Sequence, residues 1–166
     1  MKKFLLTLGL AISITAFAGC GSSSDKKQDN TKATEQAEKK LDASSIKSLC
    51  KELIDEKVFS DELSETSSKI AASQLKLSDS DFSSITCYKS SGATAEEITI
   101  VEAKDEVDLT SFFDSYISEQ KSNFESYLPA EVPKLDSAIR KKSGNYFILI
   151  VANDKDKAEK ILSKYM

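Results

Sequence analysis

Residues 146–152, YFILIVA, form a run without any charged side chain, and this run is the main basis for the predicted fold. A strand with one face in solvent alternates apolar and polar residues, whereas a strand covered on both faces is apolar throughout. We therefore expect this segment to be a central strand, with helices on at least one face. Residues 138–142, AIRKK, precede it, and the turn residues Ser143-Gly144-Asn145 predict that the two segments form a β-hairpin.

A second hairpin is expected upstream. Residues 85–90 (ITCYKS) and 96–103 (EEITIVEA) are β-branched and alternating, and the stretch SGAT joins them in a somewhat long loop, which predicts an antiparallel pair. Helical periodicity predicts three further elements, which are residues 44–56 with Ser44 or Ser45 as N-cap, residues 106–127 up to Pro129, and residues 154–165. The pattern over residues 58–84 is less regular and indicates a short strand or a loop, then a helical piece containing Ile70 and Leu75.

The order α-β-β-α-β-β-α predicts an α+β fold, a single domain over residues 44–166. Its four-stranded antiparallel sheet, made of two hairpins, packs against two or three helices. Three segments, residues 90–105, 123–136 and 142–154, resemble the family labelled domain of unknown function 4358, found as lipoproteins of Gram-positive anaerobes. No activity, cofactor or catalytic residue is established for that family, so the resemblance implies the lipoprotein architecture alone.

The N-terminus has the layout of a secretory signal peptide over residues 1–19. Lys2 and Lys3 precede residues 4–18, which carry no charge. This run is shorter than the roughly 20 apolar residues that a membrane-spanning helix needs.

Ala18 and Gly19 stand before Cys20, and this stretch looks like the lipobox of bacterial lipoproteins, although Phe17 replaces the preferred Leu. The resemblance implies that the Cys20 thiol carries a diacylglyceryl group, and that the chain is cut between Gly19 and Cys20. Cys20 would then anchor the protein to the lipid bilayer at the outer face of the cell membrane, and two acyl chains make such attachment stable. The alternative is an ordinary secretory signal cut after Ala18 or Gly19.

The composition narrows the function and the partners. Residues 20–43 are polar, with five lysines balancing five acids, and predict a disordered tether. The whole chain has a formal net charge of −4, and without Lys2 and Lys3 the charge is −6, which disfavours nucleic acid as a partner. Histidine is absent from the sequence, which excludes Ser-His-Asp and Cys-His catalysis. We expect no cofactor.

Acidic residues gather at Glu102, Asp105, Glu106 and Asp108, before the long predicted helix. These acidic side chains could bind calcium, or they could stabilise the N-terminus of the helix through its dipole and free amide groups. Because the regular spacing of a calcium loop is missing, we expect capping and no metal. Serine-lysine catalysis is also not expected, because the S-x-x-K pattern recurs as often as chance gives in a chain rich in both residues.

Cys50 and Cys87 remain once Cys20 is acylated. They form either a disulfide that joins the first helix to the sheet or two buried free thiols.

The loop between the first two strands is the candidate contact surface, with Ser91, Gly92, Thr94 and Glu96 as its residues. The alternative is a plain turn in which the glycine supplies a positive φ.

The sequence therefore predicts an extracytoplasmic lipoprotein that acts as a non-catalytic binding or accessory module for a cell-wall component or a membrane protein. The alternatives are a carboxylate-dependent hydrolase of cell-wall glycan and a purely structural spacer. A hydrolase requires two facing carboxylates, one of them with a raised pKa.

Overall fold

The computed structural model describes residues 41–105 and 107–166. The predicted signal peptide, the acylation of Cys20 and the tether up to residue 40 lie outside the described residues. The elements run in the order α1 (Ala43–Asp55), β1 (Ser64–Glu65), α2 (Ser68–Leu75), β2 (Phe82–Lys89), β3 (Glu97–Ala103), α3 (Thr110–Tyr127), η1 (Pro129–Glu131), α4 (Val132–Asp136), β4 (Ile139–Ser143), β5 (Tyr146–Val151) and α5 (Lys155–Leu162).

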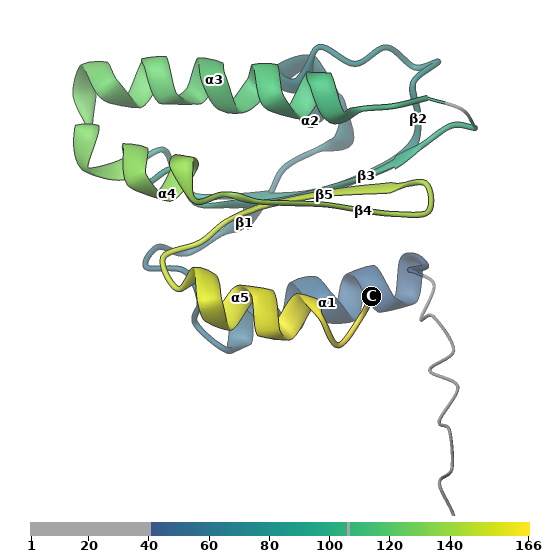
Figure 1. Cartoon of the computed structure of the whole chain (residues 1–166), viewed down its shortest axis with the longest axis horizontal. Coiled ribbons are helices and arrows are strands. Elements are labelled where there is room, and N and C mark those ends of the chain that lie inside the picture. Colours follow the sequence, from purple (N-terminus) through teal and green to yellow (C-terminus); the bar gives the residue numbers. More distant parts are fainter. Residues whose placement is uncertain (1–40, 106) are drawn as a thin grey trace, which may run out of the picture. The chain divides into compact units, whose positions relative to one another are not determined.

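The strands form one five-stranded antiparallel sheet in the order β1-β2-β3-β5-β4. Helices α2, α3 and α4 lie over one face, and α1 and α5 lie over the other (Figure 1). All six residues of β5 are buried, and β5 lies between β3 and β4. The prediction that this strand is central is confirmed. The fold is α+β as expected, but its sheet has five strands rather than four, because β1 pairs with the end of β2.

Alternate side chains of β5 supply two separate cores, one on each face of the sheet. Ile148 and Ile150 pack with α1 and α5, whereas Phe147, Leu149 and Val151 pack with α2 and α3. A strand surrounded in this way has no place for a polar side chain, which explains the uninterrupted apolar run.

Both predicted hairpins are confirmed. In the first, Lys89 faces Glu97 across the β2–β3 pair. In the second, Ser143 faces Tyr146, and only Gly144 and Asn145 form the turn between them. Gly144 has a φ of +56°, a conformation that favours glycine at this position of a short hairpin turn.

Helix α1 begins earlier than the sequence predicted, and the proposal of Ser44 or Ser45 as N-cap was wrong. Asp42 is the N-cap: its side chain accepts a hydrogen bond from the Ser45 backbone N–H, and the Ser45 hydroxyl group in turn accepts one from the Asp42 backbone N–H. Leu41 is 2% exposed and joins Ile46 in the core, a pairing known as a hydrophobic staple. The folded domain therefore includes residues 41–43, which the sequence had assigned to the tether.

Helix α3 begins later than predicted, at Thr110 rather than near residue 106. Asp108 Oδ1 accepts a hydrogen bond from the Thr110 backbone N–H at 2.8 Å, so a carboxylate does stabilise the helix start. The helix ends at Tyr127, and Pro129 begins the short 3-10 helix η1. The helix was expected to end here because proline cannot continue an α-helix. The predicted connector after it contains α4.

The weakly patterned region contains both elements that were expected there. β1 is the short strand and α2 is the helical piece, with Leu75 buried and Ile70 53% exposed. Helix α5 begins at Lys155 with Asp154 as its N-cap, one residue after the predicted start. No helix in the described part of the chain is long and apolar enough to cross a membrane.

Candidate functional site

The loop between β2 and β3 consists of an exposed tip and a buried base. Ser91, Gly92 and Ala93 are exposed at the tip, Thr94 is half-buried, and Glu96 is only 1% exposed. Gly92 has a φ of +96°, which a residue with a side chain adopts only with strain. The prediction of Glu96 as a contact residue is therefore wrong, because its side chain points into the protein, whereas the tip is accessible.

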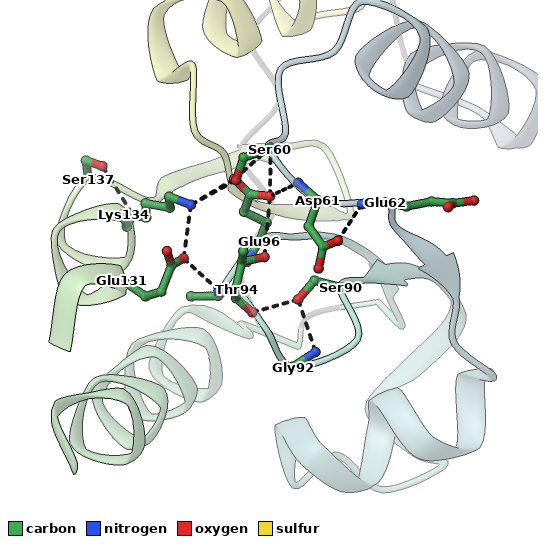
Figure 2. Close-up of polar contacts among 11 residues, drawn as sticks. Ser60, Asp61, Glu62, Ser90, Gly92, Thr94, Glu96, Glu131, Lys134 and Ser137 are labelled. Carbon is green, nitrogen blue, oxygen red and sulfur yellow. Dashed lines mark hydrogen bonds and ion pairs between the residues drawn. The ribbon is translucent and has the colours of Figure 1, made fainter. Parts of the chain in front are cut away.

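The buried Glu96 carboxylate is surrounded by hydrogen-bond donors from two distant segments (Figure 2). The backbone N–H groups of Ser60 and Asp61 donate to Oε2 at 2.9 Å each, and the Ser60 hydroxyl donates to Oε1 at 2.7 Å. Lys134 Nζ, from α4, lies 3.0 Å from Oε1. Glu96 thus joins the start of β3 to the segment after α1 and to α4.

Lys134 extends these contacts to a second acid. Its Nζ lies 3.0 Å from Glu131 Oε2, and the same oxygen accepts a hydrogen bond from the Ala95 backbone N–H at 2.9 Å. The Lys134 side chain is 17% exposed. We call Ser60, Asp61, Glu96, Glu131 and Lys134 the Glu96 cluster. It holds the base of the β2–β3 loop from two sides.

The charges of the cluster reinforce one another. Desolvation raises the pKa of Glu96, but hydrogen bonds from Ser60, Asp61 and Lys134 outweigh it, so the pKa lies below its usual value. Desolvation lowers the pKa of Lys134, but its hydrogen bonds to Glu96 and Glu131 outweigh that and raise it. Both groups are therefore held in their charged forms, which suits a structural ion pair.

A second buried carboxylate, Glu97, points to the opposite side of β3. Tyr116 OH donates to Glu97 Oε2 at 2.7 Å, and Lys89 Nζ lies 3.1 Å from the same oxygen. Lys89 Nζ also donates to Gln74 Oε1 at 2.6 Å and lies 4.7 Å from the centre of the Tyr116 ring. Burial raises the pKa of Tyr116, and the Glu97 charge raises it further. This group joins α2, α3 and the sheet, and its donors and acceptors are matched.

The acidic residues before α3 make separate contacts. Glu102 accepts hydrogen bonds from Ser84 Oγ and from Tyr146 OH, and Asp105 accepts one from Asn145 Nδ2 at 3.4 Å. Within residues 41–105 and 107–166, no three potential metal ligands of the His, Cys, Asp and Glu types come together. Glu106 lies outside the described residues.

Cys50 and Cys87 are both buried and carry free thiols. Cys50 belongs to the core beneath α1 and α5, whereas Cys87 belongs to the core beneath α2 and α3, so the sheet separates them. Burial raises the pKa of Cys50 to about 12 and also raises that of Cys87. The disulfide that the sequence left open is not present in the structure.

The sequence predicts a candidate loop but does not identify the residues that surround its base, Ser60, Asp61, Glu131 and Lys134. Ser60 is 36 residues from Glu96, and Lys134 is 38 residues away on the other side. The one local signal is Glu131 and Lys134 at i and i+3 on a helical turn, a spacing that allows a salt bridge.

The fold and the site define an α+β domain in which helices cover both faces of an antiparallel sheet and ionic clusters fix the loop. The family model described as Domain of unknown function (DUF4358) matches residues 56–152, more than half of the chain, and the chain belongs to this family. The match contains the whole sheet and the Glu96 cluster, whereas α1 and α5 lie outside it. No curated protein and no solved structure showed significant similarity to the chain.

Proposed function

We propose that this protein is a lipoprotein anchored to the outer face of the membrane through acylated Cys20. Its folded domain acts by contact with a cell-wall component or a membrane protein, and the tip of the β2–β3 loop is the contact surface. The observation that most supports this proposal is that the tip, Ser91 to Ala93, is exposed while the Glu96 cluster fixes the base of the loop. A loop held in this way is already ordered before it binds, which lowers the entropy lost on association.

The position of the loop in the domain supports this proposal. Helix α1, where the described chain begins, starts at the right end of Figure 1, whereas α4 lies at the left end. The loop is tied to α4 through Lys134 and to η1 through Glu131. The loop and the start of α1 therefore lie at opposite ends of the domain (Figure 1). An anchor on the N-terminal side leaves such a loop free to meet a partner.

The Glu96 cluster also bears on the alternative, a carboxylate-dependent hydrolase. A general acid in glycan cleavage needs a raised pKa so that it can donate a proton near neutral pH. The pKa of Glu96 is instead lowered, and its two oxygens already accept several hydrogen bonds. These contacts favour a structural role for Glu96 and thereby the contact function.

Site-directed photo-crosslinking in cells tests the proposal with the full, anchored chain. A photoreactive residue at Ala93 should form an adduct with the partner, and Ser91→Arg should abolish it by placing a bulky cation on the tip. Ser118→Arg is the matched control, because Ser118 is also an exposed serine but lies on α3. Equal adducts from a photoreactive residue at Ser118 would rule out the loop as the contact surface. Turnover of wall glycan that disappears in Glu131→Gln would establish the hydrolase instead.

A further inference from the structure

Strand β4 forms an open edge of the sheet. In the part of the chain that the structure describes, it pairs with β5 alone. Figure 1 shows the sheet edge-on between its two helix layers, and no described helix or loop is drawn across β4. An uncovered edge strand presents backbone groups that another extended chain can pair with.

The register of the β4–β5 hairpin shows which backbone groups are available. Ser143 and Tyr146 flank a two-residue turn, so they form a hydrogen-bonded pair. Hydrogen-bonded and non-hydrogen-bonded pairs alternate along an antiparallel ladder. The N–H and C=O groups of Lys142 and Arg140, which face Phe147 and Leu149, therefore point away from β5 and toward solvent.

The side chains along this edge are basic. Arg140, Lys141 and Lys142 are consecutive and exposed, in a chain whose net charge is negative. Arg140 Nη1 lies 2.7 Å from Asp114 Oδ1, in a pair about half exposed on both sides. Lys142 Nζ lies 3.9 Å from Asp108 Oδ2 and 4.7 Å from the centre of the Phe147 ring. Lys141 makes no ion pair with any described residue, so its charge is the one most open to an acidic partner. A second copy pairing with this edge would bring like charges together, which is destabilising. The edge therefore disfavours self-association and suits an acidic partner.

Two small hollows lie beside β4 on the side of α3. The first has a volume of about 280 Å³ and lies between α3 and β4, with Phe113 and Phe147 among its lining residues. These two rings are stacked, with centroids 6.4 Å apart. The second, about 230 Å³, lies beyond Lys142 near Val107 and Gly144. Every second side chain of an added strand points to this face, at intervals of about 7 Å.

We propose that β4 binds an extended, acidic segment of another protein, which adds a strand to the open edge of the sheet. Its backbone pairs with Arg140 and Lys142, and its carboxylates lie beside Lys141, whose side chain is on the face of the sheet opposite Arg140 and Lys142. One apolar side chain of the segment enters the hollow lined by Phe113 and Phe147. This mode of recognition takes affinity from the main chain and specificity from alternate side chains. It uses no residue of the β2–β3 loop, so its test is independent of the test of that loop.

A synthetic peptide tests this proposal. The probe has about nine residues, the length of a long strand, and alternates Glu with Val. The full chain in detergent micelles is titrated with it, and amide hydrogen exchange at Arg140 and Lys142 is followed by NMR. We expect exchange at both amides to slow by about tenfold or more on saturation. A peptide of equal charge with proline at every second position should not bind, because proline cannot donate to the ladder.

Two variants separate backbone pairing from charge. Lys142→Pro removes an outward N–H and should weaken peptide binding by about tenfold, and Lys141→Glu, which keeps the backbone intact, should weaken it by a similar factor. Lys160→Glu is the matched control, since it makes the same charge change at an exposed position of α5 and should leave binding unchanged. Equal binding of the proline peptide, undiminished binding by Lys141→Glu, or self-association of the wild-type chain through β4 would each overturn the proposal.

Discussion

Replacing Glu96 by Gln is the most informative perturbation of the fold. The Glu96 side chain is 0% exposed, and its two oxygens accept hydrogen bonds from two backbone N–H groups, the Ser60 hydroxyl and Lys134. Gln has one acceptor oxygen, and its amide group would face donors. Removing one partner of a buried ion pair costs about 3 to 5 kcal/mol. Glu131 still neutralises Lys134 at 3.0 Å, so we expect the lower limit, about 3 kcal/mol.

Urea unfolding of the folded domain, from residue 41 to residue 166, measures this cost. With a slope of about 2 kcal/mol per molar, a loss of about 3 kcal/mol lowers the midpoint by about 1.5 M. Glu62→Gln is the control: Glu62 is exposed, and we expect a change within about 0.5 kcal/mol. A Glu96→Gln midpoint equal to that of the control would refute the structural role assigned to the cluster.

The pH dependence of the unfolding free energy provides a second test of the Glu96→Gln variant. The folded-state pKa of Glu96 is lowered from 4.5, so its charge stabilises the fold fully above the unfolded-state value. This stabilisation is lost as the pH falls through the folded-state pKa. The difference in unfolding free energy between wild type and Glu96→Gln should therefore be largest near neutral pH and shrink below about pH 4. A difference that stays constant down to pH 2 would contradict the assignment.

Three further predictions concern other parts of the chain. Cys20→Ser should abolish incorporation of labelled fatty acid and leave an unprocessed precursor, and labelling that persisted would exclude the lipobox reading. Alkylation of the unfolded protein without reductant should modify both Cys50 and Cys87. The native protein should react slowly, because both thiols are buried. Modification of one thiol alone in the unfolded chain would contradict this prediction. Leu41→Ala should lower the unfolding free energy by about 2 to 3 kcal/mol in urea unfolding, because it empties a buried site against α1, and an unchanged value would place Leu41 outside the core.

Much of the sheet could be predicted because its strongest signals are local. Each hairpin joins strands that are neighbours in the sequence, so turn residues such as Gly144 and the alternation around them were enough. The apolar run of β5 also identified its central position, since a fully buried strand has no polar positions.

Features that depend on distant contacts could not be predicted. Glu96 looked like a loop carboxylate, because nothing near it in the sequence indicates that Ser60 and Lys134 surround it. Sequence also assigned Cys50 to a helix and Cys87 to a strand correctly. It could not say which face of the sheet that helix covers, and this decides whether the thiols can meet.

The place of β5 in the sheet has a consequence for the order in which the protein folds. A chain leaves the ribosome from its N-terminus, yet the strand between β3 and β4 is formed by residues 146–151, which follow β4 in the sequence. Until these residues emerge, β3 lacks one neighbour, and the faces of α1 and α3 lack the side chains that β5 supplies to both cores. The β2–β3 hairpin can form early, but both hydrophobic layers are completed only after β5 has emerged. A chain that stops before β5 lacks the side chains that this strand contributes to each core.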